Sequence, residues 1–235
     1  MSNQYFQFKQ FRIVQGRAAM KVSTDACIQG AWTPINHDVQ HVLDVGCGTG
    51  LLSLMLAQRN HAIEIDAIEL DPNAALDAAD NIDRSPWKER INVAAGDVKD
   101  YKTDKQYDLI VCNPPFFQNN LLSGKEDRRM ARHTISLSYS DLFAVIQRHL
   151  SSAGYASVML PSAEHEIWEN LVLKNNWSII RKLLVRPRVG LGVNRVVSLC
   201  VPAEGEIITE HLTIYDGNVY TSEFIHLLSP YYLKL

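Results

Sequence analysis

HVLDVGCGTG, at residues 41–50, places an apolar run before three glycines at alternate positions. The run is typical of a buried strand, and LLSLMLAQR at 51–59 has the periodicity of a helix. Gly46, Gly48 and Gly50 permit a sharp turn and a close approach of the backbone to a ligand. In open α/β sheets, ligands bind beyond the carboxyl ends of the strands. The stretch therefore predicts a ligand-binding loop, with a purely structural turn as the alternative.

The alternation of strand and helix continues after this loop. Strands are predicted at 63–70, 91–97, 107–113 and 154–161, and helices at 71–85, 138–150 and 162–176. Asp71 and Pro72 are the predicted start of the first of these helices, and Ser140 is the predicted cap of the second. WSIIRKLLVR and VNRVVSLCVP close the pattern as a hairpin joined by PRVGLG. The prediction is an α/β fold, with a mostly parallel sheet, helices on both faces and a C-terminal antiparallel hairpin.

The length of 235 residues suits one globular domain, with an N-terminal arm and cap segment at 1–36 and the main domain at 37–235. No run approaches the ~18 apolar residues of a membrane span, and the N-terminus lacks the apolar core of a signal peptide. The four cysteines form no C-x-x-C pair. We therefore expect a cytoplasmic, monomeric protein with reduced thiols and no metal site.

The charge distribution is uneven. The net charge of −3 argues by itself against a nucleic-acid partner. Residues 121–200, however, carry 11 Lys/Arg against 6 Asp/Glu, in GKEDRRMARH and around Arg186, Arg188 and Arg195. Most charge runs are solvated faces, but affinity for phosphates depends on local charge. The basic segments are therefore candidate contacts with a nucleic acid.

Three acids close three successive predicted strands. Asp44 precedes a G-x-G-x-G loop, which differs from the G-x-G-x-x-G of dinucleotide sites. An acid there would repel a pyrophosphate and suits a cationic ligand with an amino group. Glu69 is placed to accept from ribose hydroxyls, and Asp97 from an adenine amino group. Each acid alone is more often a helix cap, but three around one glycine loop favour a nucleoside site.

LDVGCGTG, IELDP, AGD and NPPFF, in this order, resemble the class I methyltransferases that use S-adenosylmethionine. The resemblance covers about residues 20–202 and implies a Rossmann-like, seven-stranded sheet with a reversed last strand. It implies that Asp44 and the three glycines hold the methionine part of the cofactor, Glu69 the ribose and Asp97 the adenine. KVSTDACIQGAW at 21–32 resembles the segment that closes over the methionine end, with Ser23, Thr24 and Asp25 as possible contacts. A plain cap helix is the alternative.

NPPFF after the fourth strand resembles the motif of methyltransferases that act on planar nitrogens. The Asn113 side-chain carbonyl and the Pro114 backbone carbonyl are suited to accept the two hydrogens of an adenine amino group. Phe116 is the candidate to stack on the target base, while Phe117 is expected to pack against the sheet. The motif lacks the Pro-Cys pair of enzymes that methylate base carbons. A turn with a core aromatic is the structural alternative.

A finer resemblance is to bacterial tRNA adenine-N6 methyltransferases that modify the adenine next to the valine anticodon. MKVSTDACIQGAW, the basic RRMARHT after NPPFF, and YTSEF with LSPYYLKL carry it. It implies tRNA as substrate. Lys125, Arg128, Arg129 and Arg132 follow NPPFF within 20 residues, so we expect them to contact the RNA. FQFKQFRIVQGR alternates aromatic and basic residues, which suits either RNA or an edge strand.

Other functions remain open from the residues. Glutamine-N5 methyltransferases for release factors carry a large N-terminal helical domain, and ribosomal guanine-N2 enzymes a duplicated domain; this chain has neither. A nicotinamide-dependent oxidoreductase predicts G-x-G-x-x-G, which is absent. An inactive RNA-binding protein on the same fold would not need Asn113 or the three acids.

Overall fold

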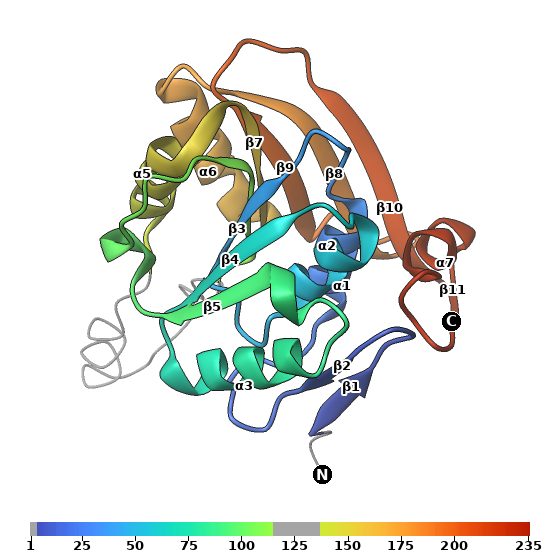
Figure 1. Ribbon diagram of the computed structural model, residues 1–235. Coiled ribbons are helices and arrows are strands. Elements are labelled where there is room, and N and C mark those ends of the chain that lie inside the picture. The colour runs from blue at the N-terminus through green and yellow to red at the C-terminus, as the bar shows by residue number, and fades with distance from the viewer. Residues whose placement is uncertain (1–3, 115–136) are drawn as a thin grey trace, which may run out of the picture.

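The computed structural model describes residues 4–114 and 137–235, which build one large mixed sheet (Figure 1). Its strand order is β11-β10-β8-β9-β7-β6-β3-β4-β5. The strands are β3 (His41–Val45), β4 (Glu64–Glu69), β5 (Ile91–Ala95), β6 (Tyr107–Cys112), β7 (Leu150–Pro161), β8 (Ser178–Arg188), β9 (Arg195–Val201), β10 (Ile208–Asp216) and β11 (Val219–Tyr220). A separate antiparallel hairpin consists of β1 (Tyr5–Gln7) and β2 (Arg12–Val14).

Helices cover both faces of this sheet, and Figure 1 shows α5 and α6 together on one side. The helices are α1 (Thr24–Trp32), α2 (Leu51–Arg59), α3 (Pro72–Asp83), α5 (Tyr139–His149), α6 (Ser162–Lys174) and α7 (Ser222–Leu228), with 3-10 turns η1 (Lys88–Arg90) and η2 (Val98–Asp100). One buried core joins α1, α2 and α7 to the sheet, and a second joins α5 and α6 to the opposite face. Within the described residues, no helix is both long and apolar enough to cross a membrane.

The order of the parallel strands reverses between β3 and β6, which is where a ligand crevice is expected. The chain runs outward from β3 to β4 and β5, and then returns to the other side of β3 as β6. Val45 pairs with Ile68 of β4 and with Cys112 of β6, so the three carboxyl ends meet at one edge. A change of direction of this kind is where α/β sheets bind ligands. β9 is antiparallel to both its neighbours, as the predicted hairpin requires.

Two details of the prediction were wrong. The sheet has nine strands rather than seven, because β10 adds parallel to β8 and β11 turns back on β10. The alternation of buried Leu212 and Ile214 with more exposed neighbours drives this addition. The cap of α5 is Ser138 rather than Ser140, since Ser138 Oγ accepts the Asp141 N–H and Asp141 reaches back to the Ser138 N–H.

Candidate active site

The glycine loop joins β3 to α2 and leaves an open cradle. Gly46, Gly48 and Gly50 have φ angles of 71°, 56° and 79°, which side chains with a Cβ rarely adopt. A Cβ built on Gly46 or Gly48 would meet nothing within 4 Å, whereas one on Gly50 would lie 3.4 Å from Ile82. The first two glycines therefore border free space, and the third permits close packing against α3.

Asp44 lies directly below this loop and is completely buried. Its Oδ2 accepts the Ser53 hydroxyl (2.7 Å) and the Ser53 N–H (3.2 Å). Its Oδ1 has no hydrogen-bond partner among the described residues. Burial raises the pKa of Asp44 to about 7; the bonds from Ser53 oppose this shift and the nearby Glu69 adds to it. A bound cation would lower the cost of ionising Asp44 and could contact its unpartnered oxygen. Asp44 is therefore suited to bind a cationic ligand.

Glu69, the last residue of β4, fixes the glycine loop. Its Oε2 accepts the Gly48 N–H at 2.7 Å, and its Oε1 accepts the Asp71 N–H at 2.9 Å. Each carboxylate oxygen has a further lone pair, so both can still accept from a ligand hydroxyl. The side chain thus has a structural role in the loop and remains half-exposed at the edge of the crevice.

Asp97 lies two residues beyond β5 rather than at its end, because β5 stops at Ala95. It caps η2 by accepting the Lys99 N–H at 2.9 Å, and it forms an ion pair with Lys99 Nζ at 3.2 Å. The Gly96 N–H donates to the Glu69 carbonyl at 2.8 Å, which keeps this segment beside the end of β4. The helix-cap alternative therefore describes its present contacts, and its role toward adenine stays a prediction.

Asn113 and Pro114 follow β6 at the same edge. Because Cys112 pairs with Val45, Asn113 comes one strand, or about 4.8 Å, from the start of the glycine loop. The Asn113 Oδ1 atom is buried without a hydrogen-bond partner among the described residues. An unpaired buried acceptor costs about 1–3 kcal/mol, so its position suits a donor from a ligand. Phe116, Lys125, Arg128, Arg129 and Arg132 lie outside the described residues.

Comparisons with known proteins agree with this geometry. The model of the methyltransferase small domain family matches residues 32–161, which include the crevice. A tRNA1(Val) (adenine(37)-N6)-methyltransferase from Aliivibrio fischeri is 42% identical over 231 residues, covering 98% of each chain. The enzyme of that name from Dyadobacter fermentans is 38% identical and covers 99% of this chain and 98% of its own. This chain belongs to their methyltransferase family.

Solved structures show the same fold at lower identity. A predicted O-methyltransferase from Agrobacterium tumefaciens superposes with a TM-score of 0.70 at 15% identity, covering 88% of this methyltransferase and 96% of that chain. The glycopeptide N-methyltransferase MtfA, solved with sinefungin, gives a TM-score of 0.53 at 16% identity, covering 77% and 86%. The expected Rossmann-like class I methyltransferase fold is therefore confirmed.

Gln29 of α1 belongs to the site of this methyltransferase, although the sequence did not single it out. The residue is completely buried, and its Nε2 donates to the carbonyls of Cys112 (3.1 Å) and Ser157 (3.0 Å). It therefore ties α1 to the last residue before Asn113. A glutamine on a helix with buried Cys27, Ile28 and Trp32 was a signal, because a buried amide needs partners.

The first turn of α1 is held by contacts within the chain. Ser23 caps the helix by accepting the Ala26 N–H, and Asp25 pairs with Arg195 of β9 at 2.7 Å. Thr24 is exposed at the first position of the helix. The role of Thr24 toward the cofactor of the methyltransferase stays a prediction.

The aromatic residues of the N-terminal arm are structural. Phe8 and Phe11 are buried, and their rings stack with centroids 4.5 Å apart. Phe8 also bridges to Tyr232 near the C-terminus. The edge-strand alternative for FQFKQFRIVQGR therefore accounts for these rings.

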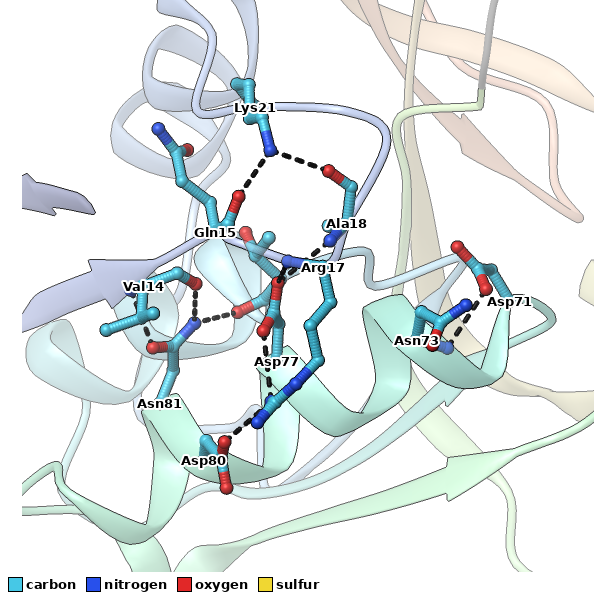
Figure 2. Close-up of polar contacts among 11 residues, drawn as sticks. Val14, Gln15, Arg17, Ala18, Lys21, Asp71, Asn73, Asp77, Asp80 and Asn81 are labelled. Carbon is cyan, nitrogen blue, oxygen red and sulfur yellow. Dashed lines mark hydrogen bonds and ion pairs between the residues drawn. The ribbon is translucent and has the colours of Figure 1, made fainter. Parts of the chain in front are cut away.

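Two cations of the arm are also engaged, Arg17 with helix α3 and Lys21 within the arm itself (Figure 2). Arg17 Nη1 contacts Asp77 at 3.1 Å and Asp80 at 2.7 Å. Lys21 Nζ donates to the carbonyls of Gln15 and Ala18. The carboxylates of α3 thus neutralise the charge of Arg17, whereas Lys21 keeps its charge.

Asn81 of α3 joins the arm to the glycine loop. Its Oδ1 accepts the Val14 N–H at 2.7 Å, while its Nδ2 donates to the carbonyls of Val14 (2.8 Å) and Thr49 (3.0 Å). Figure 2 shows Asn81 facing Val14 in this way. One side chain thus links the arm of the methyltransferase to its glycine loop.

Proposed function

We propose that this protein transfers a methyl group from S-adenosylmethionine to the exocyclic N6 of adenine 37 in tRNA1(Val). The relatives that bear this activity in their names match the chain over nearly its whole length. The structural observation that carries the proposal is Asn113 Oδ1, a buried acceptor beside the glycine cradle with no partner among the described residues. An amino group of a planar base supplies the donor that this atom lacks.

The crevice suits S-adenosylmethionine, which is positively charged at its amino group and its sulfur. Asp44 has an unpartnered carboxylate oxygen next to the open space at Gly46 and Gly48. We assign the methionine part to Asp44 and the loop, the ribose to Glu69 and the adenine to Asp97. A structural neighbour binds sinefungin on the same fold, which supports this assignment. When bound, S-adenosylmethionine supplies the reactive methyl group on its sulfonium.

The chemistry of the protein is then to make the adenine nitrogen a better nucleophile. The N6 lone pair is delocalised into the ring, and the nitrogen becomes positive as it forms its new bond. Asn113 Oδ1 and the Pro114 carbonyl accept its two hydrogens, which favours a pyramidal nitrogen and supports the developing charge. One well-placed group of this kind is typically worth about 10²–10³ in rate. Gln29 fixes the preceding carbonyl, that of Cys112, and so limits movement of Asn113.

Both acceptors lie at the end of a strand, within the protein. A base that is stacked in its loop cannot reach them, so the target base must be extruded. We assign Phe116 to stack on the extruded base.

The test is methyl transfer from isotopically labelled cofactor to total tRNA prepared without modifications, followed by nucleoside analysis. Label in N6-methyladenosine, absent with the Asn113→Ala variant, supports the proposal. Label in a methylated guanine, or in protein glutamine when release factors are supplied instead, would replace it with another member of the amino-methyltransferase group.

A further inference from the structure

The sheet continues beyond helix α6 into β8 and β10, where several polar side chains are exposed or half-buried. Lys182 of β8 reaches Glu169 of α6 at 2.9 Å, which marks the border of the helix layer. Arg186 and Arg188 follow on β8, and residues two apart on a strand share a face. β10 pairs Tyr215 with Arg188. We define the β8–β10 face as Arg186, Arg188, His211, Thr213 and Tyr215.

The two arginines of the β8–β10 face keep their charge free. Arg186 Nη1 lies 3.3 Å from His211 Nδ1, and Arg188 Nη1 lies 3.3 Å from Asn218 Oδ1. In residues 4–114 and 137–235, no carboxylate forms an ion pair with either guanidinium. By contrast, Arg181 of the same strand is paired with Glu210. The face is therefore positively charged, although the whole chain is acidic.

A column of rings holds Arg188 in place. Its guanidinium lies 5.7 Å from the centroid of the Tyr215 ring. Tyr215 stacks on Tyr220 at 4.7 Å, and Tyr220 stacks on Phe224 at 4.7 Å. Phe224 is completely buried, so the column is anchored in the core. A guanidinium ordered before binding loses less entropy when it contacts a phosphate.

The β8–β10 face lies near the same edge of the sheet as the crevice, several strands away from it. β8 lies three strands from β6, and β10 lies four, which at about 4.8 Å per strand gives roughly 14 and 19 Å from the catalytic strand. The carboxyl ends of β8 and β10 lie at the same edge as Asn113. The carboxylates Asp44, Glu69 and Asp97 lie toward the other end of this edge, at β3 to β5. The edge is thus divided into an acidic part that suits a cationic cofactor and a basic part.

We infer that the β8–β10 face binds the phosphate backbone of the tRNA while the target adenine lies at Asn113. The inference rests on the proposed function, because it takes the tRNA substrate as the occupant. Two guanidinium groups, an imidazole and a threonine hydroxyl match a phosphate backbone and carry no base-specific arrangement, so the face positions the RNA and leaves the choice of base to the crevice.

The test removes both charges with Arg186→Gln/Arg188→Gln and measures tRNA binding across salt concentrations. Each phosphate contact contributes about 0.7–0.9 to the slope of log K against log salt, so two lost contacts should lower the slope by about 1.4–1.8. We take these contacts to contribute little to affinity at 1 M salt. Over the tenfold decrease to 0.1 M salt, the lower slope then corresponds to an affinity about 25- to 60-fold weaker than that of the wild type. KM for tRNA should rise, with kcat at saturating tRNA retained.

A matched control removes two exposed cations elsewhere. Arg84→Gln/Lys88→Gln changes the net charge equally, beside the amino end of β5 and at the opposite end of the sheet. It should leave the salt slope unchanged. A second test variant, His211→Glu, places a carboxylate beside Arg186 and should also weaken binding.

An unchanged salt slope in both test variants, with wild-type sinefungin affinity, would overturn the inference. If the control lowered the slope as much as the double variant, net charge rather than this face would explain the binding, and the inference would equally fail. The proposed function is judged separately, because it fails only if the wild-type protein does not methylate N6 of adenine 37 in tRNA1(Val).

Discussion

Asp44→Asn offers the clearest perturbation of the crevice. In the folded protein, burial raises the pKa of Asp44 from 3.8 to about 7. At 1.36 kcal/mol per pKa unit, ionising this carboxyl in the ligand-free protein costs about 4 kcal/mol. Because the folded pKa is the higher one, the protonated carboxyl favours folding at low pH. This contribution is complete below about pH 4 and is lost as the pH rises through 7.

The asparagine variant lacks this titration and keeps an oxygen for Ser53. We therefore expect it to be more stable than the wild type at pH 8, with a gap in unfolding free energy that widens by about 2–3 kcal/mol between pH 5 and pH 8. Urea unfolding of both proteins at the two pH values measures the gap, since the other titrating groups are common to both. A gap that stays constant with pH would refute the reasoning.

The affinity of the wild type for a cationic ligand should rise with pH, whereas its stability falls. A cationic ligand requires the ionised carboxylate, so the wild type should bind sinefungin roughly 100-fold more tightly at pH 8 than at pH 5. The variant should bind weakly at both. Asp66→Asn, which removes a carboxylate from β4 that is bonded to Tyr107, is the matched control and should retain wild-type affinity. Equal affinity of Asp44→Asn and wild type at pH 8 would remove Asp44 from the cofactor site.

Three further predictions address the other site residues. Asn113→Ala should lower turnover by about 100-fold or more while cofactor affinity stays nearly unchanged, because Asn113 acts on the transition state; near-normal turnover in single-turnover assays would exclude it from the mechanism. Glu69→Ala and Asp97→Ala should each weaken cofactor binding by about 1–3 kcal/mol in calorimetry, and an unchanged Kd for both would mean that the crevice is misassigned. Gln29→Met keeps the side-chain volume but leaves the Cys112 carbonyl without this donor. We therefore expect a loss of about 1–3 kcal/mol in unfolding free energy and a fall in kcat with little change in KM. A loss of stability without a fall in kcat would show that Gln29 does not position Asn113.

The sequence predicted the parts of the fold that depend on local pattern. Apolar runs followed by glycine, acid or Asn-Pro gave β3, β4 and β6, and Asp71 with Pro72 gave the start of α3. The edge on which Asp44, Glu69 and Asn113 meet also followed, because parallel strands place their carboxyl ends together.

The features that were missed depend on contacts between distant segments. The sequence of β10 alternates only weakly between apolar and polar residues. The segment forms a strand because it pairs with the edge of β8. Gln29 gains its role from carbonyls that lie 83 and 128 residues further along the chain. Arg17 looked like a possible RNA contact, but the helix that carries Asp77 and Asp80 packs beside the arm and neutralises it. Local spacing holds no information on such pairings.

The central claim is that Asn113 and Pro114 present the N6 of one adenine in tRNA for methylation. The most direct measurement is mass spectrometry of the anticodon-loop fragment of a tRNA1(Val) transcript after incubation with the protein and S-adenosylmethionine, beside a transcript that differs only by guanine at position 37. We expect one added methyl group, as N6-methyladenosine, in the first fragment and none in the second. A methyl group that persists in the second transcript, or appears on another base, would contradict it.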